Sequence, residues 1–271
     1  MNILKRKSLW YTLYGIVITI VFLYVLFPAD IAKSKLEDAV HSSGFLLKTG
    51  SLRSSIPLGL KMNHVTLSSS SSPDIYFQGD WLDLQFNLLS FFRQKKSISL
   101  NGKAYDGKIS GRFGLASFSK VYPPQEGNLT LQDIDLGKYA YIKKLMGREI
   151  TGRASGNWTF NRSADRGSSG SVNLHISRGT SSLAEPFLGL SRIEFNRGDI
   201  KATLENGRIK LEKMEFFGSQ LDFLLNGDIM LADDFRNSSL NLSGEMIIAD
   251  KKVKMKINIG GTLANPVVRY I

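Results

Sequence analysis

The chain has 271 residues, of which 42% are hydrophobic, enough to bury a sizeable core in one or two domains. It contains no cysteine, which excludes disulfides, thiolate metal sites and cysteine nucleophiles. The formal net charge is +11, but most basic residues are scattered and no aromatic-plus-basic motif accompanies them, so we expect no nucleic-acid binding.

Residues 9–27 form an uncharged apolar run that follows Lys5, Arg6 and Lys7. As a helix rising about 1.5 Å per residue, this run is long enough to cross a hydrocarbon core of about 30 Å. The basic residues are expected to stay in the cytoplasm. A cleaved signal peptide is the alternative, but its apolar region is normally only about 7–15 residues long, and residues 27–32 lack a clear Ala-x-Ala-like site. The sequence therefore predicts a cytoplasmic tail (1–8), a single transmembrane helix (9–27) and an extracytoplasmic domain (28–271).

Residues 28–43 predict a short helix, because Ile31, Leu36 and Val40 are spaced as on one helical face and Gly44 follows. This helix is expected either to lie at the membrane surface or to plug the end of the domain that follows.

From Phe45 onward, apolar and polar residues alternate with the period of two that is typical of β-strands. Between Met62 and Val65 the alternation slips by one residue, which predicts a β-bulge. Asn206-Gly207 between two alternating segments predicts a hairpin. In residues 252–259 every second residue is apolar and the others are Lys or Asn, so we expect a sheet with one wet face and one dry face.

Residues 136–146 interrupt this pattern with the spacing of a short helix that stops at Gly147. Strand spacing then returns, with Gly152 and Gly156 on one face, which indicates close backbone approach or strong curvature. The predicted fold class is mainly β: an N-terminal transmembrane helix, then a twisted antiparallel β-sheet, forming a trough or a sandwich, with one or two short helices.

Motifs that would support catalysis are weak in this sequence. Residues 102–108 fit the first seven positions of a phosphate-binding loop, but Ile109 replaces the required Ser or Thr, so a glycine-rich hairpin is favoured. His41, His64 and His175 lie far apart, and residues 167–170 have the composition of a loop. Carboxylate pairs such as Asp133/Asp135 and Asp233/Asp234 are expected at turns. We therefore predict no enzyme activity, no catalytic residues, no cofactor and no metal.

The dry face of the sheet is the best candidate for a functional surface. It can pack against itself as an ordinary sandwich core, or it can form an apolar groove for lipid chains or a partner strand. The residues predicted to line such a groove are Phe77, Phe86, Phe113, Phe216, Phe223, Leu225 and Ile257.

Several segments, taken in order, give the chain a family resemblance. They are the end of the apolar run at residues 26–30 (Leu-Phe-Pro-Ala-Asp), residues 55–60 (Ser-Ile-Pro-Leu-Gly-Leu) before 65–67 (Val-Thr-Leu), residues 150–156 after a short helix, residues 206–211 followed by Gly218 and Gly227, and the closing residues 260–267 (Gly-Gly-Thr-Leu-Ala-Asn-Pro-Val). The chain resembles the type II secretion system protein N family and, more distantly, the AsmA-like proteins of Gram-negative envelopes.

The resemblance implies an inner-membrane protein with its N-terminus in the cytoplasm and a periplasmic β-rich domain. On the secretion side it implies an accessory or scaffold component of type II protein secretion, with other secretion-system proteins as partners. On the AsmA side it implies an alternative, a lipid-binding or lipid-transfer protein that handles phospholipid. The resemblance transfers no catalytic residues to this chain.

Overall fold

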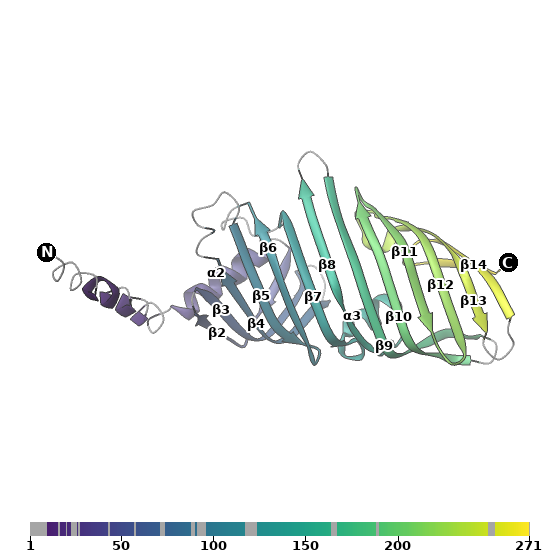
Figure 1. Cartoon of the computed structure of the whole chain (residues 1–271), viewed down its shortest axis with the longest axis horizontal. Coiled ribbons are helices and arrows are strands. Elements are labelled where there is room, and N and C mark those ends of the chain that lie inside the picture. Colours follow the sequence, from purple (N-terminus) through teal and green to yellow (C-terminus); the bar gives the residue numbers. More distant parts are fainter. Residues whose placement is uncertain are drawn as a thin grey trace.

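A computed structural model shows a mainly β protein with a few short helices, built around one large antiparallel sheet (Figure 1). The structure describes residues 10–15, 17–19, 21–22, 26, 28–42, 44–56, 58–70, 74–87, 90, 96–116, 124–163, 167–187, 190–248 and 253–270. The mainly β, antiparallel part of the predicted fold class is thereby confirmed.

In this described part of the chain, fifteen strands belong to a single sheet. β1 (Phe45–Lys48) and β2 (Ser51–Ser55) both pair with β3 (Gly59–Ser69), and from β3 on each strand pairs antiparallel with the next along the chain. The later strands are β4 (Ile75–Phe86), β5 (Lys96–Ala104), β6 (Gly107–Leu115), β7 (Glu126–Asp135), β8 (Arg153–Ser163), β9 (Gly167–Phe187), β10 (Leu190–Glu205), β11 (Arg208–Phe217), β12 (Leu221–Met230), β13 (Ser239–Ile248), β14 (Val253–Gly261) and β15 (Pro266–Tyr270).

The predicted helix in residues 28–43 is confirmed as α2 (Ala29–His41). Its small and apolar side chains, including Ala32 and Leu36, pack against a buried cluster of Leu52, Met62 and Val65. Burial of this apolar stripe stabilises a helix that is too short to be stable alone. α2 therefore covers the β1–β3 end of the sheet, which is one of the two positions expected for it.

The second predicted helix is also confirmed, as a 3-10 turn η2 (Leu136–Lys138) followed by α3 (Ala140–Met146). Gly147 ends α3 with φ of +64°, a left-handed conformation that costs glycine little. A third short turn, η3 (Phe235–Asn237), connects β12 to β13.

Part of the predicted transmembrane helix lies outside the described residues, namely residues 9, 16, 20, 23–25 and 27. Residues 10–15, 17–19 and 21–22 are helical. Among the described residues there is no helix of sufficient length and apolarity to traverse a bilayer.

Two predicted hairpins are confirmed by tight turns with positive φ. Asn206 and Gly207 have φ of +49° and +78° and connect β10 to β11. Tyr105 and Asp106 have φ of +50° and +60° and connect β5 to β6, so the segment that resembles a phosphate-binding loop is a hairpin. Positive φ at both central residues matches the right-handed twist of the flanking strands.

The irregularity predicted between Met62 and Val65 lies at His64, which has φ of +50°. Met62 and Val65 consequently both contribute to the same buried cluster although their positions differ by three. The loop predicted at residues 167–170 is wrong, because β9 begins at Gly167 and pairs with β8 from its first residue. The backbones of β8 and β10 supply hydrogen-bond partners on both sides, so these small residues form a strand despite their loop-like composition.

Candidate functional site

One face of the sheet is apolar or glycine from β4 through β14. Directly paired residues of neighbouring strands project to the same face, so the register identifies this surface. Its middle row consists of Leu82, Gly102, Ile109, Leu131, Gly156, Leu174, Ile200, Met214, Leu225, Gly244 and Ile257. We call this surface the apolar face.

Register and packing place the seven predicted groove residues on the apolar face, although they do not form one pocket. Phe86 and Phe113 both neighbour Ile98 in the N-terminal half of the sheet. Phe77 and Phe216 pack against one central cluster. Phe223, Leu225 and Ile257 belong to two clusters in the C-terminal half.

The cover over the apolar face changes along the sheet. α2 covers its N-terminal end, and Leu136 and Ile142 of the η2–α3 segment pack on its centre. Over β10–β14 the two packed clusters consist of strand residues alone, and the main contacts of these strands are with their sheet neighbours. Leu225 and Ile257 are buried there, whereas Ile209, Phe223 and Ile229 are only half-buried. The C-terminal half of the face therefore presents apolar side chains without a covering helix among the described elements.

Aromatic rings cover glycines on this face. Phe195 and Phe216 meet edge to face with their ring centroids 4.9 Å apart. A Cβ atom at Gly198 would lie 2.5 Å from the ring of Phe216, and one at Gly179 would lie 2.2 Å from the ring of Phe195. These positions leave room for nothing larger than hydrogen, so each ring lies directly against the glycine of the neighbouring strand.

A group of tyrosines holds α3 in place, and the sequence patterns did not reveal it. The rings of Tyr76 and Tyr141 lie 4.8 Å apart, and those of Tyr105 and Tyr139 lie 5.1 Å apart. The Tyr105 hydroxyl accepts a hydrogen bond of 2.7 Å from the backbone N–H of Gln78, and burial raises the pKa of Tyr105 to about 12. The presence of Tyr139 and Tyr141 at the start of a short apolar helix was the one available signal in the sequence.

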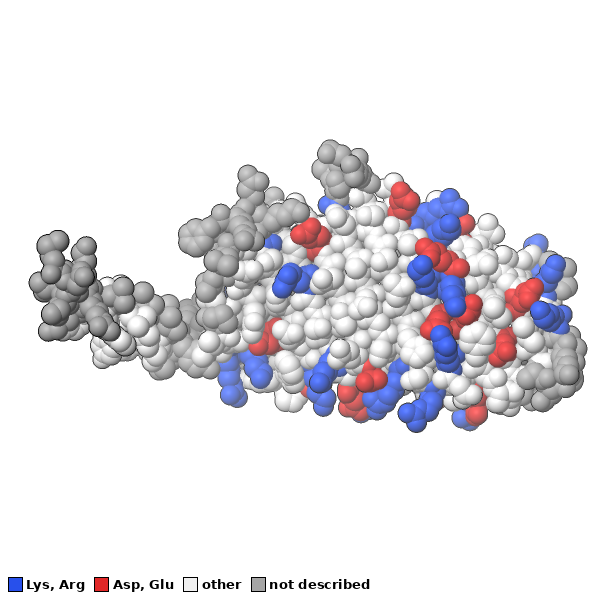
Figure 2. All heavy atoms as spheres, viewed as in Figure 1, with Lys and Arg blue, Asp and Glu red and all other residues white. Residues whose placement is uncertain are grey.

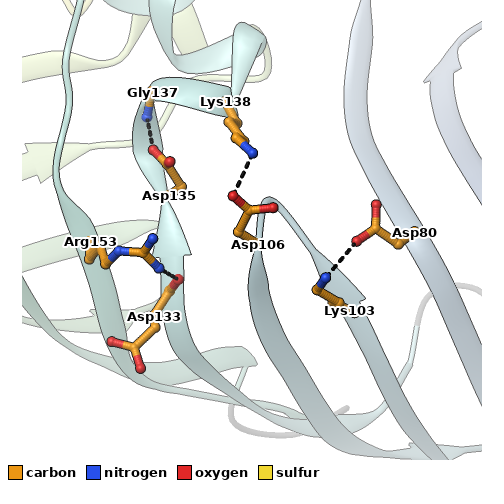
Figure 3. A network of polar contacts seen from close by, with 8 residues as sticks. All are labelled: Asp80, Lys103, Asp106, Asp133, Asp135, Gly137, Lys138 and Arg153. Atoms are coloured by element: carbon orange, nitrogen blue, oxygen red, sulfur yellow. Dashed lines mark hydrogen bonds and ion pairs between the residues drawn. The ribbon is translucent and has the colours of Figure 1, made fainter.

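Ion pairs surround the β5–β6 turn, where it meets η2 (Figure 3). Lys138 lies 2.5 Å from Asp106, and Lys103 lies 3.5 Å from Asp80. Asp133 and Asp135, the carboxylate pair expected at a turn, have structural roles here. Asp135 accepts a hydrogen bond from the Gly137 N–H at 2.9 Å and caps η2, whereas Asp133 lies at a β-bulge with φ of +53°.

A cavity of about 410 Å³ adjoins these ion pairs. Its lining is mainly polar and consists of His64, Val65, Thr66, Gln78, Gly79, Asp80, Tyr105, Asp106 and Lys138. Because Asp80 pairs with Lys103 and Asp106 pairs with Lys138, the negative charges at the cavity are balanced by positive ones.

We expect the attachment of η2 to weaken in acid. Lys138 lowers the pKa of Asp106 by hydrogen bonding, so the ion pair stabilises the folded state above the unfolded pKa of this carboxyl and is lost as the pH falls through its lower folded value. The protection of the backbone amides of residues 136–139 against hydrogen exchange, measured relative to the intrinsic rate at each pH, should fall in that acidic range. Asp106→Asn retains a residue that tolerates φ of +60° and should make exchange fast already at neutral pH. Unchanged exchange in Asp106→Asn would contradict the role of this pair.

The opposite face of the sheet carries charged side chains (Figure 2). Over β10–β12 its charges form pairs, such as Lys201–Glu212 at 2.7 Å and Arg208–Asp228 at 2.8 Å. Nearer the middle of the sheet, hydroxyl and amide groups pair across strands, as Thr159 and Ser171 do at 2.7 Å, and Figure 2 shows few charges there. The sheet therefore has the expected wet face and dry face.

The three histidines do not form a metal site in the part of the chain that the structure describes, since no group of three or more potential ligands occurs there. His175 lies on the polar face with its Nδ1 atom 3.0 Å from Asp199 Oδ1, and this hydrogen bond lowers the pKa of Asp199.

Comparison of the chain with protein-family models, with curated proteins and with solved structures found no match in any of the three. The resemblance to the type II secretion system protein N family therefore stays a prediction from the sequence.

Proposed function

We propose that this chain is a membrane-anchored envelope protein that binds lipid acyl chains along its apolar face, as the AsmA side of the resemblance implies. In this proposal residues 9–27 cross the inner membrane, the sheet lies in the periplasm, and the apolar face is an open trough. The observation that carries the proposal is an apolar face that runs from β4 to β14 and, over β10–β14, includes partly exposed side chains such as Ile209, Phe223 and Ile229 without a covering helix among the described elements.

The dimensions and energetics of the face support an acyl ligand. With neighbouring strands about 4.8 Å apart, the path across the apolar face from β4 to β14 is roughly 48 Å long, more than the hydrocarbon thickness of a bilayer, which is about 30 Å. Each methylene group that an acyl chain buries there contributes about 0.8 kcal/mol. Half-buried side chains such as Ile209, Phe223 and Ile229 would lose their remaining contact with water at the same time.

Exposed apolar side chains near the N-terminus support the anchor. Trp10, Tyr11 and Tyr14 are 65–75% exposed, and Val17, Val21 and Phe22 are 50–59% exposed. A hydrocarbon environment removes the cost of exposing such side chains to water.

Lipid that copurifies with the full chain tests the proposal. The protein should be extracted from membranes with its native lipid and then delipidated stepwise, and organic extracts should be quantified by mass spectrometry. We expect phospholipid to remain in stoichiometric amount after a control single-span protein has lost its annular lipid. Equal and complete loss from both proteins would contradict lipid binding by the sheet.

A scaffold role in type II protein secretion remains the second candidate, and the bare edge of the sheet at β15 favours it. All five residues of β15 are exposed, as a surface for a partner strand requires. Loss of protein secretion on deletion of this chain, with unchanged lipid transport, would favour the scaffold role over lipid handling.

A further inference from the structure

The two edges of the sheet differ in what lies beside them. At the N-terminal edge, β1 and β2 are short and α2 packs beside them, where Lys33 Nζ donates a hydrogen bond of 2.9 Å to the carbonyl oxygen of Thr49. At the other edge, β15 pairs with β14 and, among the described residues, with no other strand. An edge strand leaves alternate N–H and C=O groups without sheet partners, which makes it a template for another strand.

Side chains at the β15 edge continue both faces of the sheet. Val268 pairs with Ile259 on the apolar face and remains 43% exposed. On the polar face, Arg269 follows Lys254 and Lys256 of β14, and all three are exposed. Lys254 lies 3.9 Å from Glu245, but within the described part of the chain neither Lys256 nor Arg269 has an ion-pair partner. The β15 edge is thus apolar on the side of Val268, and on the other side it carries Val267 and Arg269, with Lys254 and Lys256 on the same face of β14.

We propose that β15 docks a β-strand of a partner protein whose side chains are apolar on the trough side and acidic on the opposite side. Such a strand would extend the apolar face beyond Val268 and place a carboxylate next to Arg269, with Lys256 on the same face one strand further in. Cross-strand pairs of opposite charge stabilise strand pairing, and complementary charges select the partner.

A second copy of this chain is a poorer occupant of the edge. Pairing two β15 strands would bring Arg269 of both copies onto neighbouring strands, with Lys254 and Lys256 of each copy on the same face one strand further in. Like charges on neighbouring strands destabilise pairing, and basic residues on edge strands are a recognised protection against self-association.

Short strand peptides of opposite charge test the proposal on the full chain in nanodiscs of neutral lipid. One fluorescent peptide alternates Val or Thr with Glu, and its counterpart carries Lys in place of each Glu. Anisotropy should show the acidic peptide binding about tenfold or more tightly than the basic one, with an affinity that falls as salt rises. Equal binding of the two peptides would overturn the proposal.

Variants and cross-linking locate the docked peptide. The double variant Lys256→Glu, Arg269→Glu should reverse the preference, whereas Lys210→Glu, on the polar face of the interior strand β11, should leave it unchanged. Because the chain has no cysteine, Val268→Cys offers one site for disulfide trapping of a cysteine-bearing acidic peptide. Ile75→Cys places a cysteine at an exposed site on β4, and equally efficient trapping there would argue against a partner strand at β15. Concentration-dependent dimerisation that the acidic peptide does not suppress would argue against it as well.

This docking extends the proposed function, but the two can fail separately. A variant that loses lipid should still bind the acidic peptide, since Phe223 lies three strands away from β15. Peptide docking without copurifying lipid would contradict only the proposed lipid function. Lipid binding without charge-selective docking would contradict only the proposed β15 interface.

Discussion

Replacing Phe223 with aspartate should strip bound lipid from the protein while the sheet stays folded. Phe223 is half-buried on the apolar face, paired with Phe216 on one side and Met246 on the other. A carboxylate pressed against acyl chains lacks both water and a partner, which costs several kcal/mol. Each 1.4 kcal/mol changes affinity by about tenfold, so lipid occupancy should fall by at least that factor. Mass spectrometry of organic extracts from the purified full chain measures it.

Asn226→Asp is the matched control, because it places the same charge on the same strand but at an exposed position of the opposite face. It should retain the lipid content of the unmodified protein. Phe223→Leu, which keeps the site apolar, should also retain most of the lipid. If Phe223→Asp shows an unchanged circular dichroism spectrum and unchanged lipid content, acyl chains do not bind at this part of the face.

Local patterns in the sequence predict the strands and turns of this fold well, for a physical reason. A strand with one wet face and one dry face must alternate, as Val253, Met255 and Ile257 alternate with lysines in β14. Asn206-Gly207 predicts its hairpin because it supplies positive φ at both central positions of the turn. Both signals are contained within a few neighbouring residues.

β9 shows where local patterns fail. It is a 21-residue strand, and its first residues, Gly167 to Gly170, carry the small polar side chains of a loop. Their strand conformation depends on pairing with β8 and β10, and the amino-acid composition of residues 167–170 gives no sign of this pairing. Tertiary context overrides local propensity at such positions.

The candidate site was predictable as a face but not as a set of contacts. Alternation within β12 places Phe223 and Leu225 on the dry side. Which residue lies opposite each of them depends on the register between strands. The helix over the central part of the face is held by Tyr105 and Tyr139, whose rings are in contact although they are more than thirty residues apart in the sequence. Long-range packing of this kind leaves no periodic signal in the sequence.

The close approach of β12 and β13 depends on glycine, so Gly244→Ala should destabilise the protein strongly. A Cβ atom at Gly244 would lie 1.8 Å from the carbonyl oxygen of Leu224 in the paired strand β12. This contact involves backbone, so a side-chain rotation cannot relieve it, and β12 and β13 would have to move apart. Overpacking in a well-packed region typically costs about 1–3 kcal/mol, and we expect the upper part of that range. Urea unfolding of the full chain should show a lower transition midpoint.

Gly260→Ala, one strand further along, separates steric overlap from the general effect of replacing glycine. A Cβ atom at Gly260 would approach nothing closer than 3.9 Å, and its backbone does not require positive φ. Since alanine restricts the unfolded chain more than glycine does, this variant should be neutral or more stable by up to about 1 kcal/mol. Equal destabilisation by both substitutions would show that glycine content alone, and not close approach of β12 and β13, governs stability here. A loss of stability confined to Gly244→Ala, with a parallel loss of copurifying lipid, would connect the close approach of β12 and β13 to the proposed binding of acyl chains at this face.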